Sequence, residues 1–575
     1  MEDEGPRKRI DQNPESDTRE RVIIRDAEEN PRTRDGPTSS EKSGETETPQ
    51  RTEYEHSKLN EQIYRYTFIP RIILAGCWPV CMAICSYNLY LAQEAEPDLK
   101  ELHIFSPGMF TNLTGRGRDF LDNLWNLLAF DFFPKCYLWY GFYGVFARLL
   151  QSCAPKTLPT FSMLLSFAFL IQLVSFPALV FALSQMVVFW IIQRLNSKIA
   201  LWLTALSYLF GTANSFHQYI LPLNEEVYGY YYLIPITSWN CGRCISFYYD
   251  TWNRPNRTSL TSLLTCTQFC FYFPLTVWGP LECFERYEKS ILLPSASAKP
   301  KCQVQKDFFY MIVKLVRFSF WGIFSELLLH YLYFSMISKD RIFLEPVNML
   351  AIFGIMLWLG HFIQLKYIVL YGIPGAIAEA DGLPMLVSPS CIIHIHRYSN
   401  LWRAIDRGMY NWFVRYCYVP TLELIAKLDK ENKIQKDFRN ILAALPPFVF
   451  IILWHHYTST ILVWALTNFV LLTAEKVASY IKRRIDSKYN IAPAIWDVIV
   501  EPIFTTPLGP ISGIINSALF GSNLVGGHIL IYRSFTEGIY YLPYGYFMGH
   551  LGVLVATWPK VCKIVFRKPK GRMTR

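Results

Sequence analysis

Long apolar stretches alternate with short polar segments along most of the chain after residue 66. A helix needs roughly 20 apolar residues to cross a bilayer, and these stretches are long enough to do so. The pattern predicts membrane-spanning helices near Thr67–Ala92, Leu124–Gln151, Phe161–Ile192, Ile199–Ile220, Phe308–Ile337, Val347–Ala378, Leu442–Thr473, Leu508–Tyr532 and Tyr540–Cys562. Two further stretches are more polar, Tyr228–Phe247 and Ala404–Leu422, and are typical of re-entrant or interfacial helices. The predicted fold is an all-α polytopic membrane protein with roughly ten transmembrane helices plus re-entrant segments.

Three segments of different composition divide the chain. Residues 1–60 are rich in Glu, Arg, Ser, Thr and Pro and almost lack aromatic residues. Such a segment buries too little apolar surface to offset the entropy of ordering, so we expect it to be disordered. Residues 61–565 form one predicted membrane domain, and residues 566–575 form a basic tail. No apolar stretch follows Met1 closely, so we expect the first span to be retained as a signal anchor.

The net charge of +10 is concentrated rather than spread along the chain. Basic residues gather after Pro559, at Lys560, Lys563, Arg567, Lys568, Lys570, Arg572 and Arg575. Positive charge directly after a helix indicates a cytoplasmic C-terminus and a segment that can contact anionic lipid. The charge therefore indicates membrane lipids as partners and does not indicate nucleic-acid binding.

The 14 cysteines are scattered, and several lie within predicted spans. This distribution is not a disulfide framework. Cys241 and Cys244 form a Cys-x-x-Cys pair without a second pair nearby, which is an incomplete ligand set for zinc. The sequence therefore predicts no metal site.

Three blocks carry residue types that can do chemistry. Phe271–Tyr287 contains two prolines and a glycine between apolar stretches, and broken backbone at membrane depth is tolerated where it lines a cavity. Trp402–Pro420 is rich in aromatic residues and holds Asp406 among arginines. Trp454 and His455 lie in a strongly apolar run, where an ionisable side chain is costly unless it faces a polar cavity or takes part in chemistry.

Together these blocks resemble the membrane-bound O-acyltransferase family from about Tyr228 to the C-terminus. Within the family, the hedgehog acyltransferase branch is similar in Asp-x-Gly-x-x-Asn-x-x-x-Arg-Tyr-x-Tyr-x-Pro at Asp406–Pro420. Further matches to the branch are Ser325–Tyr333, Lys366–Pro374 with Asp381–Leu383, and Trp464–Asn468 with Glu475. Many other members carry Asn or His where this branch has Asp406.

The resemblance implies transfer of a long-chain acyl group, such as palmitoyl, from acyl-CoA to the N-terminal cysteine of a secreted, hedgehog-like protein. It also implies a central catalytic tunnel in a multi-pass protein of the endoplasmic reticulum or Golgi. An imidazole has an ordinary pKa near 6.5, so His455 can act as general base, with Asp406 orienting it or the acceptor. We expect the tunnel to be lined by Trp454, Trp402, Arg403, Asn411 and Arg415, with arginines contacting CoA phosphates.

Two positions leave alternatives open. The residue after the family histidine is commonly small, but here it is His456, and either imidazole could face the cavity; the motif spacing favours His455. Cys391 lies eleven residues before Trp402, as does a cysteine of the branch that can hold haem iron. The alternative for Cys391 is a loop cysteine with no ligand, or one that is itself acylated.

Structural roles compete with functional ones at other charged positions. Glu326 and His330 share one helix face, and we favour a hydrogen-bonded pair that stabilises the bundle. Asp406 could be paired simply with Arg403 or Arg407.

Three alternatives to protein acylation remain: acylation of a small lipid or glycerolipid, a catalytically degenerate regulatory relative, and a transporter. Retention of His455 argues against degeneracy, and the absence of a symmetric pair of interrupted helices argues against a transporter.

Overall fold

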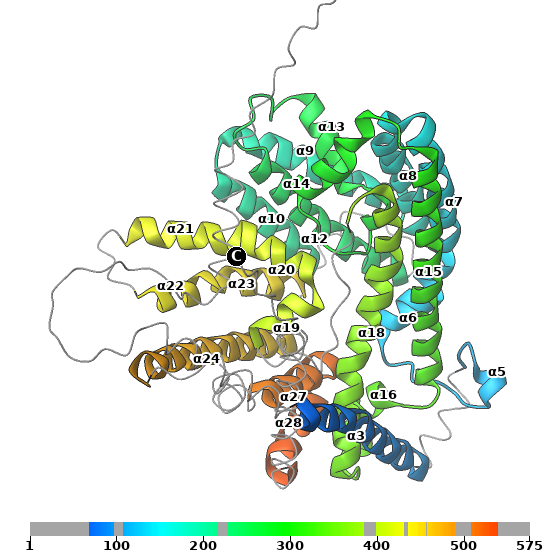
Figure 1. Ribbon diagram of the computed structural model, residues 1–575, viewed down its shortest axis with the longest axis vertical. Coiled ribbons are helices and arrows are strands. Elements are labelled where there is room, and N and C mark those ends of the chain that lie inside the picture. Colours follow the sequence, from blue (N-terminus) through cyan, green and yellow to red (C-terminus); the bar gives the residue numbers. More distant parts are fainter. Residues whose placement is uncertain are drawn as a thin grey trace, which may run out of the picture. The chain divides into compact units, whose positions relative to one another are not determined.

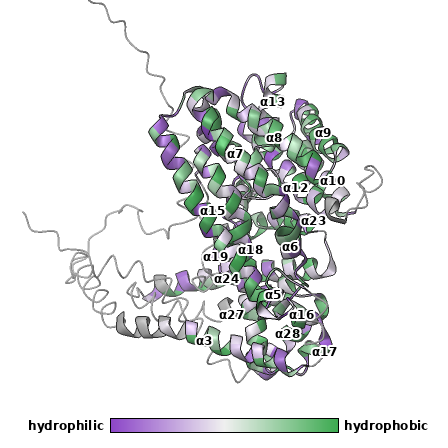
Figure 2. Ribbon diagram, turned by 90° about the vertical axis from the view of Figure 1, so that its right-hand side faces the viewer, coloured by the Kyte–Doolittle hydropathy of each residue, from purple (hydrophilic) through white to green (hydrophobic). Residues whose placement is uncertain are grey.

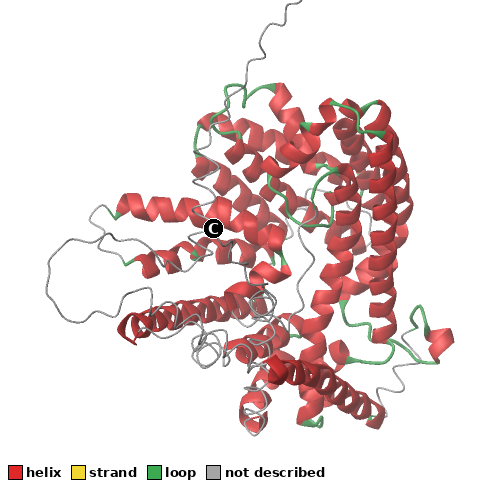
Figure 3. Ribbon diagram, viewed as in Figure 1, coloured by secondary structure: helices red, strands yellow, loops and turns green. Residues whose placement is uncertain are grey.

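The computed structural model describes residues 68–96, 107–214, 227–384, 398–429, 435–455, 457–489 and 508–538. Within these ranges every regular element is a helix, as Figure 3 shows. The predicted all-α class is therefore confirmed for this part of the chain. Residues 1–60, the predicted span Tyr540–Cys562 and the basic tail lie outside the described residues.

The helices follow one another closely along the chain (Figure 1). Those of the first half are α3 (Phe68–Ala95), α5 (Thr111–Thr114), α6 (Asn123–Asn126), α7 (Phe133–Cys153), α8 (Leu158–Leu173), α9 (Phe176–Ile192), α10 (Lys198–Ala213), α12 (Val227–Asp250), α13 (Leu260–Cys270) and α14 (Phe284–Tyr287). Those of the second half are α15 (Lys301–Leu329), α16 (Phe334–Lys339), α17 (Arg341–Leu344), α18 (Met349–Asp381), α19 (Tyr398–Ile405), α20 (Arg407–Phe413), α21 (Val419–Leu428), α22 (Lys436–Ala443), α23 (Leu445–Trp454), α24 (Ser459–Tyr489), α27 (Leu508–Gly521) and α28 (Leu524–Thr536). Short 3₁₀ or π turns join several of them, at Leu127–Phe132, Pro155–Thr157, Gln193–Leu195, Phe273–Leu275, Glu288–Leu292, Pro294–Ala296 and Val414–Tyr418.

Several predicted single spans are wrong, because the chain breaks within them. The stretch Phe161–Ile192 is two helices, α8 and α9, since the Ser175 hydroxyl caps α9 by accepting a hydrogen bond from the Ala178 amide at 3.2 Å. The stretch Leu508–Tyr532 is likewise two helices, because the Asn523 side chain caps α28. The mean hydropathy of a long stretch does not reveal such caps, because a single Ser or Asn changes that mean only a little.

Five helical segments of the described residues are long and apolar enough to cross a membrane: Pro155–Leu173, Phe176–Leu195, Met349–Asp381, Asp437–Trp454 and Ser459–Ile485. The shorter apolar helix Lys198–Ala213 adds to them. A multi-pass membrane protein is supported, whereas the count of roughly ten spans stays a prediction.

Apolar side chains also face outward on several helices. Figure 2 shows largely apolar ribbon along α7, α8 and α9. Leu149, Leu164 and Val180 on these helices are about half exposed, as is Val316 on α15. Exposed apolar surface of this extent marks a membrane or partner contact. In a membrane protein we assign it to lipid.

Helix α18 connects the two buried clusters of the core. Its first two thirds, from Met349 to Val369, pack in a cluster with α16 and α28, and its last turns pack with α7, α12 and α13. It lies beside α15 along much of its length (Figure 1). Asn348 caps its start, and Gly382, with a φ of 116°, ends it in a conformation that favours glycine. This long helix carries Tyr371 into the centre of the molecule.

Candidate active site

The Trp454–His455 pair lies at a break in the chain. The prediction of one helix over Leu442–Thr473 is wrong: α23 ends at Trp454, and α24 begins at Ser459. Tyr457, with a φ of 31°, takes a left-handed conformation in the turn between them, and its amide donates to the Ile452 carbonyl at 2.9 Å. The turn places His455 at a helix end, where its side chain is less confined than in a helix interior.

Aromatic rings surround His455 and Trp454. The His455 imidazole contacts Phe520 of α27 and Trp464 of α24, with ring centroids 5.5 and 6.0 Å apart. Trp454 contacts Trp239 of α12 edge-on at 4.1 Å. His456 lies outside the described residues, so the choice of His455 over His456 as the base stays a prediction.

Asp406 is buried at the junction of α19 and α20. Its carboxylate accepts a hydrogen bond from the Met409 amide at 2.9 Å, which caps α20, and one from the Tyr371 hydroxyl of α18 at 2.7 Å. Neither α19 nor α20 is long enough to span a bilayer. Burial raises the pKa of the Asp406 carboxyl above its usual range, while these two hydrogen bonds oppose the rise.

The structural alternative for Asp406 predicted an ion pair with Arg403 or Arg407. Arg403 instead donates to the Tyr410 hydroxyl at 2.9 Å and lies over the Tyr410 ring. The hydrogen bonds that hold Asp406 come from a tyrosine and the backbone, which fix the direction of the carboxylate without neutralising it.

A chain of ring contacts leads from His455 toward Asp406. Trp464 contacts the His455 ring and also Trp402, with centroids 5.5 Å apart in the second pair. Trp402 lies four residues before Asp406, on α19, and its indole donates to the Tyr398 hydroxyl at 3.0 Å. Trp464 thus contacts both the His455 ring and α19, the helix that ends just before Asp406.

Asn468 and Glu475 of α24 hold α19 in place. The Tyr398 hydroxyl is hydrogen-bonded to the Asn468 side-chain oxygen, and Glu475 accepts from the Ser399 amide at 2.7 Å and the Ser399 hydroxyl at 2.6 Å. The sequence marked Asn468 and Glu475 only as matches to the family branch. In the structure, Asn468 and Glu475 fix α19, the helix that carries Trp402.

The remaining predicted tunnel residues lie in different surroundings. Asn411 is exposed on α20. The Arg415 guanidinium forms ion pairs with Asp250 at 3.1 Å and Glu285 at 2.5 Å, which joins the π turn after α20 to α12 and α14. Arg415 therefore holds elements together, and a contact with a CoA phosphate would compete with two carboxylates. Cys391 lies outside the described residues, and no described contact supports haem.

Sequence reasoning missed several buried polar atoms on α12 and in the block Phe271–Tyr287. The indole nitrogens of Trp239 and Trp278 and both amide atoms of Asn240 have no hydrogen-bond partner among the described residues. Asn240 and Trp239 are almost fully buried. Buried polar atoms are nearly always hydrogen-bonded, so atoms left over point to a water or a ligand. The run Ser238-Trp239-Asn240, in a helix that also carries Arg243, was the available signal.

Glu282 extends this group toward Asp406. It is 3% exposed, and its Oε2 atom accepts no described hydrogen bond, although the Arg286 guanidinium lies 3.5 Å away. Gly408 lets the chain after Asp406 approach this block, because a Cβ there would come within 2.7 Å of the Leu281 carbonyl oxygen. Trp239 thus lies against Trp454, and the chain after Asp406 lies against Leu281, next to Glu282.

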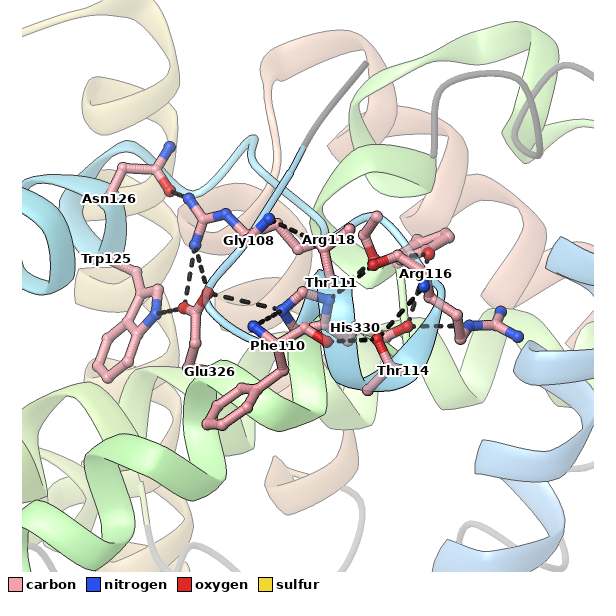
Figure 4. A network of polar contacts seen from close by, with 12 residues as sticks. Gly108, Phe110, Thr111, Thr114, Arg116, Arg118, Trp125, Asn126, Glu326 and His330 are labelled. Carbon is pink, nitrogen blue, oxygen red and sulfur yellow. Dashed lines mark hydrogen bonds and ion pairs between the residues drawn. The ribbon is translucent and has the colours of Figure 1, made fainter. Parts of the chain in front are cut away.

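The pair Glu326 and His330 belongs to a different polar network, at the end of α15 (Figure 4). Glu326 accepts hydrogen bonds from Arg118 at 3.2 and 3.0 Å and from the Trp125 indole at 2.9 Å. His330 Nδ1 faces the carbonyls of Arg116 and Gly117 at 3.1 and 3.2 Å. The predicted direct hydrogen bond between Glu326 and His330 is wrong: His330 Nε2 lies 3.9 Å from Glu326 Oε1 and accepts from the Phe110 amide instead. Each of the two residues is held by other partners.

Residues 220–506 match the model of the membrane-bound O-acyltransferase family. The chain belongs to this family. The matched region runs from α12 to α24 and includes Asp406, His455, Asn240 and Glu282. Much of the interior described above therefore lies within the region that matches the family.

Among relatives, the chain is similar to two protein-cysteine N-palmitoyltransferases. It is 27% identical over 299 residues to Rasp of Drosophila melanogaster, which covers 50% of this chain and 54% of that protein. It is 25% identical over 207 residues to HHAT of Mus musculus, covering 36% of this chain and 39% of that protein. It is also 24% identical over 221 residues to the membrane-bound O-acyltransferase gup1 of Schizosaccharomyces pombe, covering 38% and 33%. The chain matches about half the length of these relatives or less.

Proposed function

We propose that this acyltransferase moves a long-chain acyl group, such as palmitoyl, from acyl-CoA to the N-terminal cysteine of a secreted, hedgehog-like protein. The observation that carries the proposal is the buried Asp406 carboxylate, which accepts a hydrogen bond from Tyr371. It follows directly on α19, whose Trp402 contacts Trp464, and Trp464 also contacts the His455 ring. Similarity to two protein-cysteine N-palmitoyltransferases supports the choice of acceptor. The reaction would take place in the endoplasmic reticulum or Golgi.

The acyl thioester already has a good leaving group, so the main task is to deprotonate the acceptor. In the proposed step His455 takes a proton from the acceptor, while the amine nitrogen or thiol sulfur of the acceptor bonds to the thioester carbon. The carbon–sulfur bond to CoA then breaks, and the imidazolium returns the proton to the departing thiolate. If the cysteine thiol is acylated first, its own amine displaces it and gives the stable amide. Asp406 stabilises the charged imidazole or positions the acceptor.

The unpartnered buried atoms suit the oxygen of the thioester. The Asn240 amide and the indole N–H groups of Trp239 and Trp278 are buried donors with no hydrogen-bond partner among the described residues. Such preorganised donors stabilise the oxyanion that develops during acyl transfer. Trp454 and Arg403 complete the proposed tunnel, with Arg403 as a contact for a CoA phosphate.

A lipid acceptor is the second candidate. It is favoured by the similarity to gup1, a member of the family whose name does not mention protein cysteine. The base and the oxyanion donors would serve either acceptor, because both reactions begin from the same thioester. Only the shape and polarity of the acceptor entrance distinguish them.

Incubation of the purified full chain with labelled palmitoyl-CoA tests the two acceptors against each other. The panel contains a peptide with an N-terminal cysteine, the same peptide with an acetylated amine, the same peptide with an N-terminal serine, and a lysolipid. We expect label that resists hydroxylamine on the first peptide alone, because an amide survives and a thioester does not. Labelling of the lysolipid without any peptide labelling would overturn the protein acceptor and leave the acyl-CoA reaction standing.

A further inference from the structure

Three cysteines from two helices meet away from the candidate active site. Cys244 of α12 and Cys266 and Cys270 of α13 have sulfur atoms that all lie within 4.8 Å of one another. The Cys244–Cys270 and Cys266–Cys270 sulfur pairs are 3.9 and 4.0 Å apart. All three residues have zero exposure. Of the Cys-x-x-Cys pair that looked incomplete in the sequence, Cys244 thus lies beside two cysteines of the next helix, whereas Cys241 lies outside the cluster.

We propose that this cluster is a binding site for a soft metal ion, Cu(I), held by the three thiolates. At a metal–sulfur distance of about 2.3 Å, sulfurs lie about 3.8 Å apart in a tetrahedral site and about 4.0 Å apart in a trigonal one. Both described sulfur pairs already have this spacing. The ligands therefore need little rearrangement to accept the ion.

A fourth sulfur makes the donor set soft throughout. The Met186 thioether of α9 lies 3.5 Å from the Cys244 sulfur and is buried. Thiolate and thioether ligands select Cu(I), whereas structural zinc sites use four cysteine or histidine ligands. Among the described residues the cluster contains no histidine or carboxylate. The donor set thus favours Cu(I) over zinc.

Two neighbouring side chains suit thiolates better than thiols. Tyr248 lies one helical turn after Cys244 on α12 and is buried, and its hydroxyl has no hydrogen-bond acceptor among the described residues. A thiolate would accept that hydrogen bond. Arg243 is also buried and donates to the Cys270 carbonyl at 2.8 Å and to the Leu275 carbonyl. An anionic metal centre that forms beside the buried Arg243 guanidinium would balance its positive charge, which the neighbouring carbonyls do not neutralise.

Binding exchanges three thiol protons for one Cu(I) ion. The protons leave to solvent, the three sulfurs bond to the metal, and no electron is transferred. The centre then carries two negative charges, of which Arg243 offsets one and the Tyr248 hydrogen bond stabilises another. The ion would tie α13 to α12, the helix that carries Trp239 and Asn240, and this structural role does not depend on the proposed acceptor.

The test is Cu(I) titration of the purified full chain in detergent with reductant, in competition with a chromophoric Cu(I) chelator. We expect one Cu(I) per chain and a first shell made of sulfur only, measured by X-ray absorption. Cys266→Ser with Cys270→Ser should lower the Cu(I) affinity more than about 100-fold, and Tyr248→Phe about 10-fold. Cys241→Ser is the matched control, because Cys241 is equally buried on α12 but lies outside the cluster. This variant should keep wild-type affinity.

Each outcome decides the assignment. Wild-type protein that takes up well under one Cu(I) per chain would overturn the site, whether or not the cysteine variants fold. Equal losses in Cys241→Ser and in the cluster variant would also overturn it, because the effect would then be one of packing. Zinc at one per chain, with no displacement by Cu(I), would overturn the choice of metal.

Discussion

His330 and His455 occupy similar places in the chain but very different surroundings. Each follows the last residue of an apolar helix, α15 or α23. The His330 ring is fully buried, its Nδ1 faces two carbonyls, and its Nε2 accepts from the Phe110 amide at 3.3 Å. The described ring contacts of His455 are aromatic, with Phe520 and Trp464, and the residue is half-buried.

The comparison shows what distinguishes a structural histidine from a candidate base. Backbone groups use both nitrogens of His330, so its proton is fixed on Nδ1 and its ring joins the loop before α6 to α15. His455 lies at a chain break and follows Trp454, which contacts Trp239 of α12, a residue whose buried indole nitrogen has no hydrogen-bond partner among the described residues. A histidine at the end of an apolar helix is therefore not informative by itself; the atoms that face its nitrogens decide its role.

The largest expected effect is on activity at His455. His455→Ala should lower the rate of acyl transfer by about 10²–10⁴-fold, because a general base typically contributes that much. The melting temperature should change little, since the residue lies at a helix end. Transfer per folded molecule is measured with labelled palmitoyl-CoA, and His528→Ala, an exposed histidine of α28, is the control. Normal turnover in His455→Ala would contradict the base role.

The reverse pattern is expected at His330. His330→Ala leaves the Phe110 amide and two carbonyls without their partner, at a cost of about 1–3 kcal/mol for a buried group. The melting temperature in detergent should fall, while transfer per folded molecule stays near that of the wild type. A large loss of turnover in protein of unchanged stability would contradict the structural role and weaken the comparison.

Asp119, close to His330 in the same region, gives a smaller effect that depends on pH. It accepts hydrogen bonds from the Ser335 and Met336 amides, and burial raises its pKa to about 6. The folded protein therefore binds this proton more tightly than the unfolded chain, and the stability so gained is lost as the pH rises through about 6. Lowering the pH from 7 to 5 should stabilise the wild type relative to Asp119→Asn by about 1 kcal/mol. An unchanged difference in melting temperature between the two proteins would reject the raised pKa.

The smallest effect is expected at the N-terminus. Deletion of residues 2–50 should leave transfer within about twofold of the wild-type rate, because the composition of the segment does not favour a folded structure. The assay is the same labelled transfer, normalised to folded protein. A large fall in the transfer rate would show that the segment acts at the active site. The comparison of the two histidines would then leave out residues that contribute to catalysis.

The apolar pattern was enough to predict an all-helical membrane protein, but it failed wherever a polar cap breaks a helix. Ser175 and Asn523 divide predicted spans because each satisfies a backbone amide at a new helix start, an effect of single atoms. Asp406 and His455 could be singled out because charge in an apolar setting is costly. The roles of Tyr371 and Trp464 could not, because contacts between residues far apart in the chain leave no local pattern. The three cysteines that meet across α12 and α13 were missed for the same reason.

A double-mutant cycle of Asp406→Asn and His455→Ala tests most directly whether the two residues serve one reaction. Residues that act as a unit are strongly non-additive, so the double variant should be about as slow as the slower single variant. The measurement is single-turnover transfer of labelled palmitate to the N-terminal-cysteine peptide, with all variants normalised to folded protein. Rate losses that multiply, so that the double variant shows the product of the two single losses, would contradict a shared reaction centre.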